Sequence, residues 1–316
     1  MNDKHARSFH EITDESKWLA MRARDITSTE VSALFGLNPY ETHLELWHRK
    51  KEQQVVKFEG NERMKWGTRL EAAIAEGVAE DRGWKIRKKN DYGRIPALRM
   101  GASFDYEVTE PESALLEVKN VDGLVFKRSW TPEGDDTAPP PHIELQLQQE
   151  MLVGNRVRNH CAALVGGNSP VVVTRDADPD VQAALVEQVA KFWQSIEANQ
   201  PPAPDYLRDA DFLARKLYGT ADGTEMNADA DLDALLREFA ELKDQASAVD
   251  GAVTIAKSKI LERIGSHSRV LAASGTLSAG MTKPSTGTLI TADMVGTYIG
   301  ARAGFRSLRF TRRKEK

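Results

Sequence analysis

The segment over residues 101–120 constrains the fold of this chain more than any other part of its sequence. Two short apolar runs flank a turn-rich stretch centred on Pro111, a pattern typical of a β-hairpin. If the strands pair symmetrically about Pro111, Asp105 lies opposite Glu117, and such neighbours have Cβ atoms roughly 4.5–5.5 Å apart. Lys119 follows two residues later, so strand alternation puts it on the same face. The sequence thus predicts two carboxylates and a lysine side by side.

Elementary electrostatics gives two interpretations of this charged hairpin. Two carboxylates at that distance repel each other unless one is protonated or a cation lies between them. Oxygen ligands suit a hard ion such as Mg²⁺, and a lysine beside it can serve a water or a phosphate, which favours metal-assisted phosphodiester chemistry. The alternative is a set of solvated cross-strand salt bridges, each of which contributes little. Leu115, Leu116 and Val118 indicate that the strand is packed on at least one face.

The composition is that of a soluble globular protein with one large domain and an appendage, or with two domains. The chain has 316 residues, of which 28% are charged, and a formal net charge of −4. That balance excludes a surface coated in positive charge but allows a local nucleic-acid-binding surface. The single cysteine, Cys161, permits neither an intrachain disulfide nor a cysteine-based zinc cluster. With a polar N-terminus and no apolar run of membrane length, a cytoplasmic protein is expected.

The periodicity of apolar residues predicts an α/β core followed by a helical appendage. Helices are expected over 14–35 as a helical hairpin, then from Thr42, over 62–82, over 143–154, and from Asp178 or Asp180 to Ala198. Strands are expected beside the hairpin over 84–88, 95–100, 161–165 and 171–175. The proline-rich stretch 200–204 is the clearest linker. We therefore divide the chain into a core, residues 1–205, and an accessory region, residues 206–316.

A heptad pattern dominates the accessory region. Apolar residues recur with alternating gaps of three and four, at Leu232, Leu235, Phe239, Leu242, Ala246, Val249, Val253, Ala256 and Ile260. This predicts a long helix laid against another element, or two helices bent near Gly251. An amphipathic helix packed on its own domain explains the pattern as well as coiled-coil association does. Basic residues crowd the chain from Arg302 onward, which is consistent with phosphate contact and with a solvated tail.

Motifs on both sides of the hairpin connect the core to a known family. Upstream are Trp18-Leu-Ala-Met-Arg22 and Trp66-Gly-Thr-Arg-Leu-Glu71, and downstream is Gln146-Leu-Gln148 in a predicted helix. In this order and spacing the set resembles the lambda-exonuclease/YqaJ family of phage-type recombination nucleases, within the Asp…Glu-x-Lys nuclease superfamily. The resemblance covers about residues 14–205. It implies an α/β, restriction-endonuclease-like core with a central mixed sheet flanked by helices.

The resemblance implies roles for the charged residues of the hairpin. Asp105 and Glu117 would bind the metal together with the backbone carbonyl of Val118. Lys119 would orient or activate the attacking water and stabilise charge at the phosphate. Glu71 would reach the site from the long helix as a further acidic group, for a second metal or through a water.

Other roles follow from the same resemblance. Gln146 would hold the nucleophile or the scissile phosphate, whereas Gln148 would support the structure, because residues two apart on a helix point in different directions. Three further residues would contact phosphates of the DNA, the first two at the 5′ end: Arg22, Thr29 and Ser103. The chain departs from the family in having Ile143 where an aromatic residue often precedes the glutamines.

The function implied is that of a Mg²⁺-dependent 5′→3′ exonuclease, with Mn²⁺ as a substitute, which degrades double-stranded DNA from its ends. The resulting 3′ overhangs would serve phage-type homologous recombination with a single-strand annealing recombinase, in a bacterial host cell and from a phage or prophage. A homo-oligomer is expected, a trimer by resemblance, and no membrane association. Two alternatives stay open: a restriction-like or structure-specific endonuclease on the same core, and a non-catalytic DNA-binding module.

Overall fold

A computed structural model gives the fold, and it describes residues 6–55, 61–133 and 136–282. The chain divides into two units, Met1–Ala210 and Asp211–Lys316. The first unit extends past the linker over 200–204 because the next segment binds back to the core. The Asp209 carboxylate accepts hydrogen bonds from the Thr42 hydroxyl and from the Asp205 N–H.

The first unit is built on a five-stranded mixed sheet in the order β11–β10–β7–β6–β3. These strands span, in that order, Ser169–Asp176, Arg158–Val165, Ala114–Val121, Tyr106–Glu110 and Lys85–Lys88. β7 and β10 run parallel, and the other neighbours run antiparallel. A parallel pair needs a crossover connection, and the connection here contains the helix α5, Pro141–Gly154. The mixed α/β core predicted from the sequence is confirmed.

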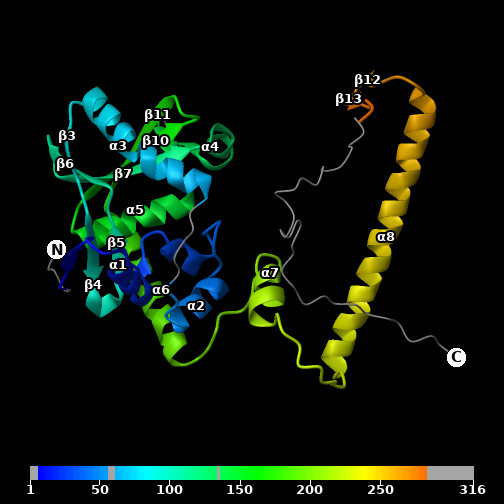
Figure 1. Ribbon diagram of the computed structural model, residues 1–316, viewed down its shortest axis with the longest axis horizontal. Helices are drawn as coiled ribbons and strands as arrows, with labels where there is room; N and C mark the ends of the chain where they lie inside the picture. The colour runs from blue at the N-terminus through cyan, green and yellow to red at the C-terminus, as the bar shows by residue number, and fades with distance from the viewer. Residues whose placement is uncertain (1–5, 56–60, 134–135, 283–316) are drawn as a thin grey trace, which may run out of the picture. The chain divides into compact units, whose positions relative to one another are not determined.

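Helices α3 (Glu62–Arg82) and α5 cover the two faces of this sheet (Figure 1). Side chains alternate between the faces along each strand. Leu116, Val118 and Ala162 therefore pack with the apolar stripe of α3. Cys161 and Ala163 point the other way and pack with α5. The central strands are buried on both sides, which fixes their register.

A second sheet, in the order β1–β4–β5–β2, contains Ser8–Glu11, Asp91–Ile95, Met100–Ser103 and Ile26–Thr27. β2 runs parallel to β5. The strand predicted over 95–100 is wrong, because β4 ends at Ile95. Pro96 has no N–H to donate to a strand ladder, and it begins a short 3-10 helix instead. β5 then leads directly into the hairpin.

The other helices of the first unit are α1, α2, α4 and α6, at Glu15–Arg24, His43–Lys51, Gly123–Ser129 and Pro179–Glu197. Thr42 caps α2 through a capping box, and Asp178 caps α6, as predicted. A small ribbon joins β8 (Thr131–Glu133) to β9 (Asp136–Ala138).

The helical hairpin predicted over 14–35 is wrong in its second helix, because a strand follows α1. The backbone N–H groups of Ile26 and Ser28 donate to the carbonyls of Arg99 and Gly101, at 2.8 and 3.0 Å. Because of these bonds the segment forms the strand β2. The rest of the predicted second helix contains a short 3-10 helix, Val31–Phe35.

The chain continues from the core with α7 (Ala210–Phe212), a π-helical turn over Leu213–Leu217, the long helix α8 (Ala230–Ile264), and a hairpin of β12 (Arg269–Ala272) and β13 (Gly275–Ser278). α8 runs without a break through Gly251, so the alternative of two helices bent there is wrong. The basic residues from Arg302 onward lie outside the described residues. Within the described ranges, no helix combines the length and apolarity needed to cross a bilayer.

Gly101 lies where β5 approaches a buried cluster of polar side chains. A Cβ atom here would touch the Tyr92 hydroxyl and lie 2.5 Å from its Cζ and 3.1 Å from Asp25 Oδ2. Tyr92 and Asp25 are fully buried and hydrogen-bonded to each other at 3.2 Å. Arg94 binds both carboxylate oxygens of Asp25, at 2.6 and 2.7 Å, so the cluster has no room to move aside.

We expect Gly101→Ala to lower the free energy of unfolding by about 1–3 kcal/mol, as overpacking of a dense interior does. Urea denaturation measures the change. Gly77→Ala on α3 is the matched control, because its Cβ meets nothing within 4 Å and alanine favours a helix by up to about 1 kcal/mol over glycine. Equal stability of the two variants would show that Gly101 is not tightly packed against Tyr92 and Asp25.

Candidate active site

The carboxylate of Asp105 is held against β7 just before β6 begins. The two strands pair with Tyr106 opposite Leu116, the register predicted from symmetry about Pro111. Asp105 comes one residue earlier, and its Oδ2 accepts the Val118 N–H at 2.9 Å. A strand residue directs its N–H and C=O towards the same neighbour, so the carbonyl of Val118 faces the same side as Asp105.

Glu117 and Lys119 project from β7 towards α5, because Leu116 and Val118 between them pack with α3. The Lys119 ammonium lies 2.6 Å from Glu117 Oε1. Gln146 reaches both from α5: its Nε2 donates to Glu117 Oε1 at 2.7 Å, and its Oε1 accepts from Lys119 Nζ at 3.1 Å. These three predicted residues form one closed network.

Burial and neighbouring charges shift the pKa values in this network. Burial raises the pKa of Asp105 well above its ordinary value, and the Glu117 carboxylate raises it further. Burial by itself lowers the pKa of Lys119, but the carboxylates of Glu117 and Asp105 outweigh it and raise that pKa above the ordinary value. Lys119 is therefore a cation, suited to stabilising negative charge rather than to accepting a proton.

Glu71 lies near this network but belongs to α3, on the other face of the sheet. Its carboxylate pairs with the ammonium of Lys88, which also lies 4.7 Å from the centre of the Tyr106 ring. Its charge contributes to the raised pKa of Asp105. The structure thus places Glu71 beside Asp105, with Lys88 as its ion-pair partner, while the other catalytic candidates bond to one another on the α5 face.

The oxygen donors beside Lys119 fit a small divalent cation. Asp105, Glu117 and the Val118 carbonyl form the oxygen-only set that Mg²⁺ prefers. Burial and, after it, the charge of Glu117 raise the pKa of Asp105, and a cation between the two carboxylates would offset their repulsion. In the described part of the chain, no group of three or more His, Cys, Asp or Glu side chains is arranged to hold a metal ion. A cation here would depend on the backbone carbonyl and on water or substrate oxygens, as Mg²⁺ commonly does.

Glu150 is a residue of this site that the sequence analysis missed. It is buried on α5, one turn after Gln146. Its Oε1 accepts from Gln146 Nε2 at 2.8 Å, and its Oε2 accepts from Asn159 Nδ2 at 2.9 Å. Burial raises the pKa of Glu150 well above its ordinary value, and the Glu117 carboxylate adds to this. The spacing of four between Gln146 and Glu150 was the available signal, because such residues share a helical face.

The raised pKa of Glu150 makes stability depend on pH. An acid with a higher pKa in the folded state contributes stability that is fully present below its unfolded pKa, about 4.3, and is lost as the pH rises through the folded pKa. Glu150→Gln is neutral at every pH. We therefore expect it to gain stability relative to the wild type as the pH is raised from about 5 to about 9. The Oδ1 atom of Asn159, buried without a hydrogen-bond partner among the described residues, can accept from the new amide.

Urea denaturation at several pH values in chelator measures this trend. Glu76→Gln, on an exposed part of α3, is the control and is expected to leave the pH dependence unchanged. A constant stability difference between Glu150→Gln and the wild type across the pH range would overturn the prediction.

Trp18 connects two of the three residues predicted to bind phosphate. The Arg22 guanidinium lies 4.8 Å from the centre of the Trp18 ring, and the indole N–H donates to Ser103 Oγ at 3.2 Å. Thr29 is exposed, with its hydroxyl 3.2 Å from that of Thr27. β2, which contains Thr27, lies directly beside β5, which ends at Ser103. Arg22 and Ser103 thus both contact Trp18. Thr29 lies two residues after Thr27 of β2, the strand that pairs with β5.

Gln148 supports the scaffold, as the sequence analysis expected. Its Nε2 donates to the carbonyl of Asp176 at 3.0 Å, and its Oε1 accepts the N–H of Asp178 at 2.9 Å. These bonds tie the end of β11 to the start of α6. Ile143, at the position where the family often has an aromatic residue, packs in the core beside Trp130.

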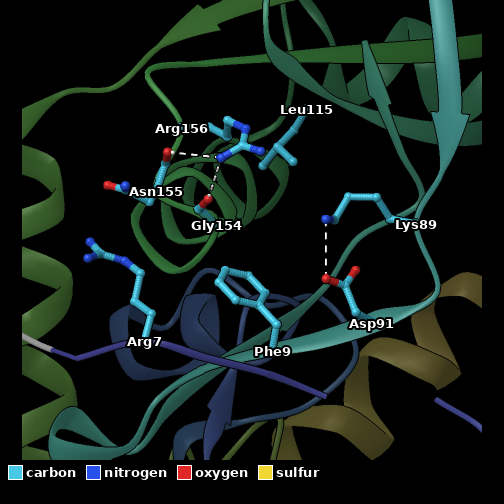
Figure 2. Close-up of a pocket in the computed structure, with 8 residues that line it drawn as sticks. All are labelled: Arg7, Phe9, Lys89, Asp91, Leu115, Gly154, Asn155 and Arg156. Atoms are coloured by element: carbon cyan, nitrogen blue, oxygen red, sulfur yellow. Dashed lines mark hydrogen bonds and ion pairs between the residues drawn. The ribbon is translucent and has the colours of Figure 1, made fainter. Parts of the chain in front are cut away.

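A cavity of about 430 Å³ lies beside the C-terminal end of α5 (Figure 2). The guanidinium groups of Arg7 and Arg156 line it, and both donate to carbonyl oxygens in the last turn of α5, at 3.1 Å. Such bonds satisfy carbonyls that the helix leaves without partners. Lys89 is paired with Asp91 at 3.2 Å. The lining contains none of the predicted site residues, so we assign these cations to the end of the helix rather than to catalysis.

Comparisons with known proteins show what this chain is similar to. Residues 17–157 match the model of the YqaJ-like viral recombinase domain. The uncharacterized protein YqaJ of Bacillus subtilis is 27% identical over 256 residues, which cover 78% of this chain and 78% of that protein. Two solved structures are similar in fold: LHK-Exo in complex with dAMP, with 20% identity and a TM-score of 0.47, and the alkaline exonuclease LHK-Exo from Laribacter hongkongensis, with 19% identity and a TM-score of 0.46. Each of the two matches covers 63% of this chain and 99% of the LHK-Exo chain. Residues 17–157 are therefore similar to the YqaJ-like viral recombinase domain, and every residue of the predicted site lies within the matched range.

Proposed function

We propose that the chain is a Mg²⁺-dependent 5′→3′ exonuclease that digests double-stranded DNA from its ends and leaves 3′ single-stranded overhangs. The observation that carries the proposal is the closed network of Glu117, Lys119 and Gln146 beside Asp105, within the residues that match the model of a recombinase domain. Recombination needs a single-stranded end, and digestion of one strand from its 5′ end provides it. The natural partner is a single-strand annealing recombinase that receives this overhang.

Each side chain has a defined task in this chemistry. When bound by Asp105, Glu117 and the Val118 carbonyl, Mg²⁺ supplies a more acidic water and neutralises charge on the phosphate. The Val118 N–H holds Asp105 in place. Lys119 orients the attacking water and stabilises the negative charge that develops on the scissile phosphate. Gln146 keeps the Lys119 ammonium beside Glu117, because it binds both groups at once.

The proposed 5′ polarity rests on Arg22. A guanidinium recognises a phosphate through two parallel N–H donors, and the Trp18 ring at 4.8 Å limits the directions in which this one can point. Hydrogen bonds to charged groups contribute about 1.5–3 kcal/mol each, so Arg22→Ala is expected to reduce the preference for 5′-phosphorylated over 5′-hydroxyl ends by about tenfold or more. The measurement is the rate of digestion of the two linear duplexes. Arg24→Ala, on an exposed position of the same helix, is the control.

The function is tested with linear and covalently closed circular duplexes of the same sequence, in Mg²⁺ and in chelator. An end-dependent exonuclease digests only the linear DNA and only with the metal. Cleavage of the closed circle would favour the endonuclease alternative, and DNA binding without cleavage would favour the non-catalytic one. Indifference of the wild type to the 5′-phosphate would remove only the role of Arg22 and Thr29.

A further inference from the structure

The apolar heptad seam of α8 faces solvent over most of its length. Leu235, Leu242, Val249, Val253 and Ile260 each expose between 45% and 61% of their surface. α8 has 35 residues, so it is about 52 Å long. A helix with a continuous apolar stripe normally buries that stripe against a partner.

We propose that α8 pairs with α8 of a second copy of this chain as an antiparallel coiled coil, with Ala246 opposite Val249 of the partner subunit. In heptad notation, position a is occupied by Leu232, Phe239, Ala246, Val253 and Ile260. Position d is occupied by Leu235, Leu242, Val249, Ala256 and Arg263. In an antiparallel pair each a residue packs against a d residue of the other helix.

The sizes of the seam residues favour this pairing. Phe239 meets Ala256 of the partner subunit, and Ala246 meets Val249 of the partner subunit, so each small side chain faces a larger one. A parallel pair in register would put Phe239 against its own copy. It would also put Ala246 and Ala256 against theirs, which leaves two poorly filled layers in the seam and costs stability.

The charges that flank the seam select the same register. Glu238 and Lys259 occupy position g, and Lys243 and Asp250 occupy position e. In an antiparallel pair g faces g and e faces e. Glu238 then lies beside Lys259 of the partner subunit, and Lys243 beside Asp250 of the partner subunit. The two-fold symmetry repeats both contacts, so these four charges are matched, and Lys257, also at position e, lies beside Leu236 of the partner subunit.

Neighbouring registers lose this match. A shift of one heptad in one direction places Lys243 beside its own copy, and a shift in the other direction places Asp250 beside its own copy. A parallel pair keeps only the contact between Glu238 and Lys243 of the partner subunit. Gly251 occupies position f, on the side of α8 away from the seam, so its missing side chain leaves no gap in this interface.

Disulfide cross-linking of the full chain tests the arrangement. Ile260 lies opposite Leu235 of the partner subunit, so Leu235→Cys and Ile260→Cys are made as separate variants. Co-expressed, they are expected to form a covalent dimer that contains one of each, whereas either variant expressed alone stays uncross-linked. Ser258→Cys, at position f, is the control for random collision. Cys161 is fully buried, so the wild type provides the background.

Sedimentation of charge variants supplies the second measurement. Glu238→Lys is expected to weaken the wild-type dimer by about tenfold or more, and Glu238→Lys combined with Lys259→Glu is expected to restore it. Cross-linking of each cysteine variant alone would instead establish a parallel pair. A monomeric full chain without cross-links would show that this face of α8 is covered within one chain. Either result overturns the proposal.

Discussion

Lys119→Ala is expected to lower the rate of DNA digestion by about 10²–10³-fold, the loss typical when a positioned group that stabilises transition-state charge is removed. The ammonium of Lys119 lies 2.6 Å from Glu117 and is held by Gln146, so its charge has a fixed position. Neighbouring carboxylates keep it protonated. The measurement is single-turnover digestion of a 5′-phosphorylated linear duplex in Mg²⁺.

Two comparisons separate this electrostatic role from a structural one. Lys191→Ala removes an exposed lysine that pairs with Glu187 on α6, and it is expected to digest DNA at the wild-type rate. Binding of the same duplex in chelator is expected to change little in Lys119→Ala, because the loss is confined to the transition state. Digestion by Lys119→Ala at the wild-type rate would remove Lys119 from the mechanism.

The hairpin could be read from the sequence because its determinants are local. The alternation of β7 has a period of two, and the turn at Pro111 fixes which residues oppose each other. Both signals lie within residues 101–120. They were enough to place Asp105 beside the strand that carries Glu117 and Lys119.

Contacts between distant segments could not be read in the same way. Glu71 lies near Asp105, but its position on the face of the sheet opposite to α5 and its pairing with Lys88 depend on packing between distant segments. A single sequence does not reveal which face of a sheet a helix covers. Glu150 was missed for a related reason, since a charged residue on a helix suggests a solvated face until the packing shows it to be buried.

Lys50 is the clearest case of such a hidden residue. The sequence His48-Arg-Lys-Lys51 at the end of α2 is typical of a solvated, basic helix terminus. The structure instead buries Lys50 almost completely, with an exposed fraction of 2%. Its ammonium donates to the carbonyls of Arg22 and Asp25, at 2.7 and 2.6 Å, and lies 2.8 Å from Glu30 Oε2. One cation thus joins α2 to the end of α1 and to the turn after β2.

We expect Lys50→Met to lower the free energy of unfolding by about 3–5 kcal/mol, the range for breaking a buried ion pair by removing one partner. Methionine keeps most of the volume but removes the ammonium donor from the Asp25 carbonyl and from the Arg22 carbonyl, which keeps the Asp25 N–H at 3.3 Å. Lys51→Met is the matched control, because Lys51 is exposed on the same turn, and its loss is expected to cost less than about 1 kcal/mol. Urea denaturation of both variants measures the difference, and similar values for the two would show that the buried cation does not brace these elements.

The free energy of unfolding at acidic pH provides an independent test of this prediction. Burial by itself raises the pKa of Glu30, but the charges of Lys50 and Arg49 outweigh it and hold that pKa well below its ordinary value. A carboxyl with a depressed folded pKa contributes stability that is present above its unfolded pKa, about 4.3, and is lost as the pH falls towards the folded one. Without Lys50 the depression is smaller, so the stability deficit of Lys50→Met should shrink as the pH falls below about 4. A deficit that stays constant on acidification would mean that Lys50 acts through packing alone, and not through its charge on Glu30.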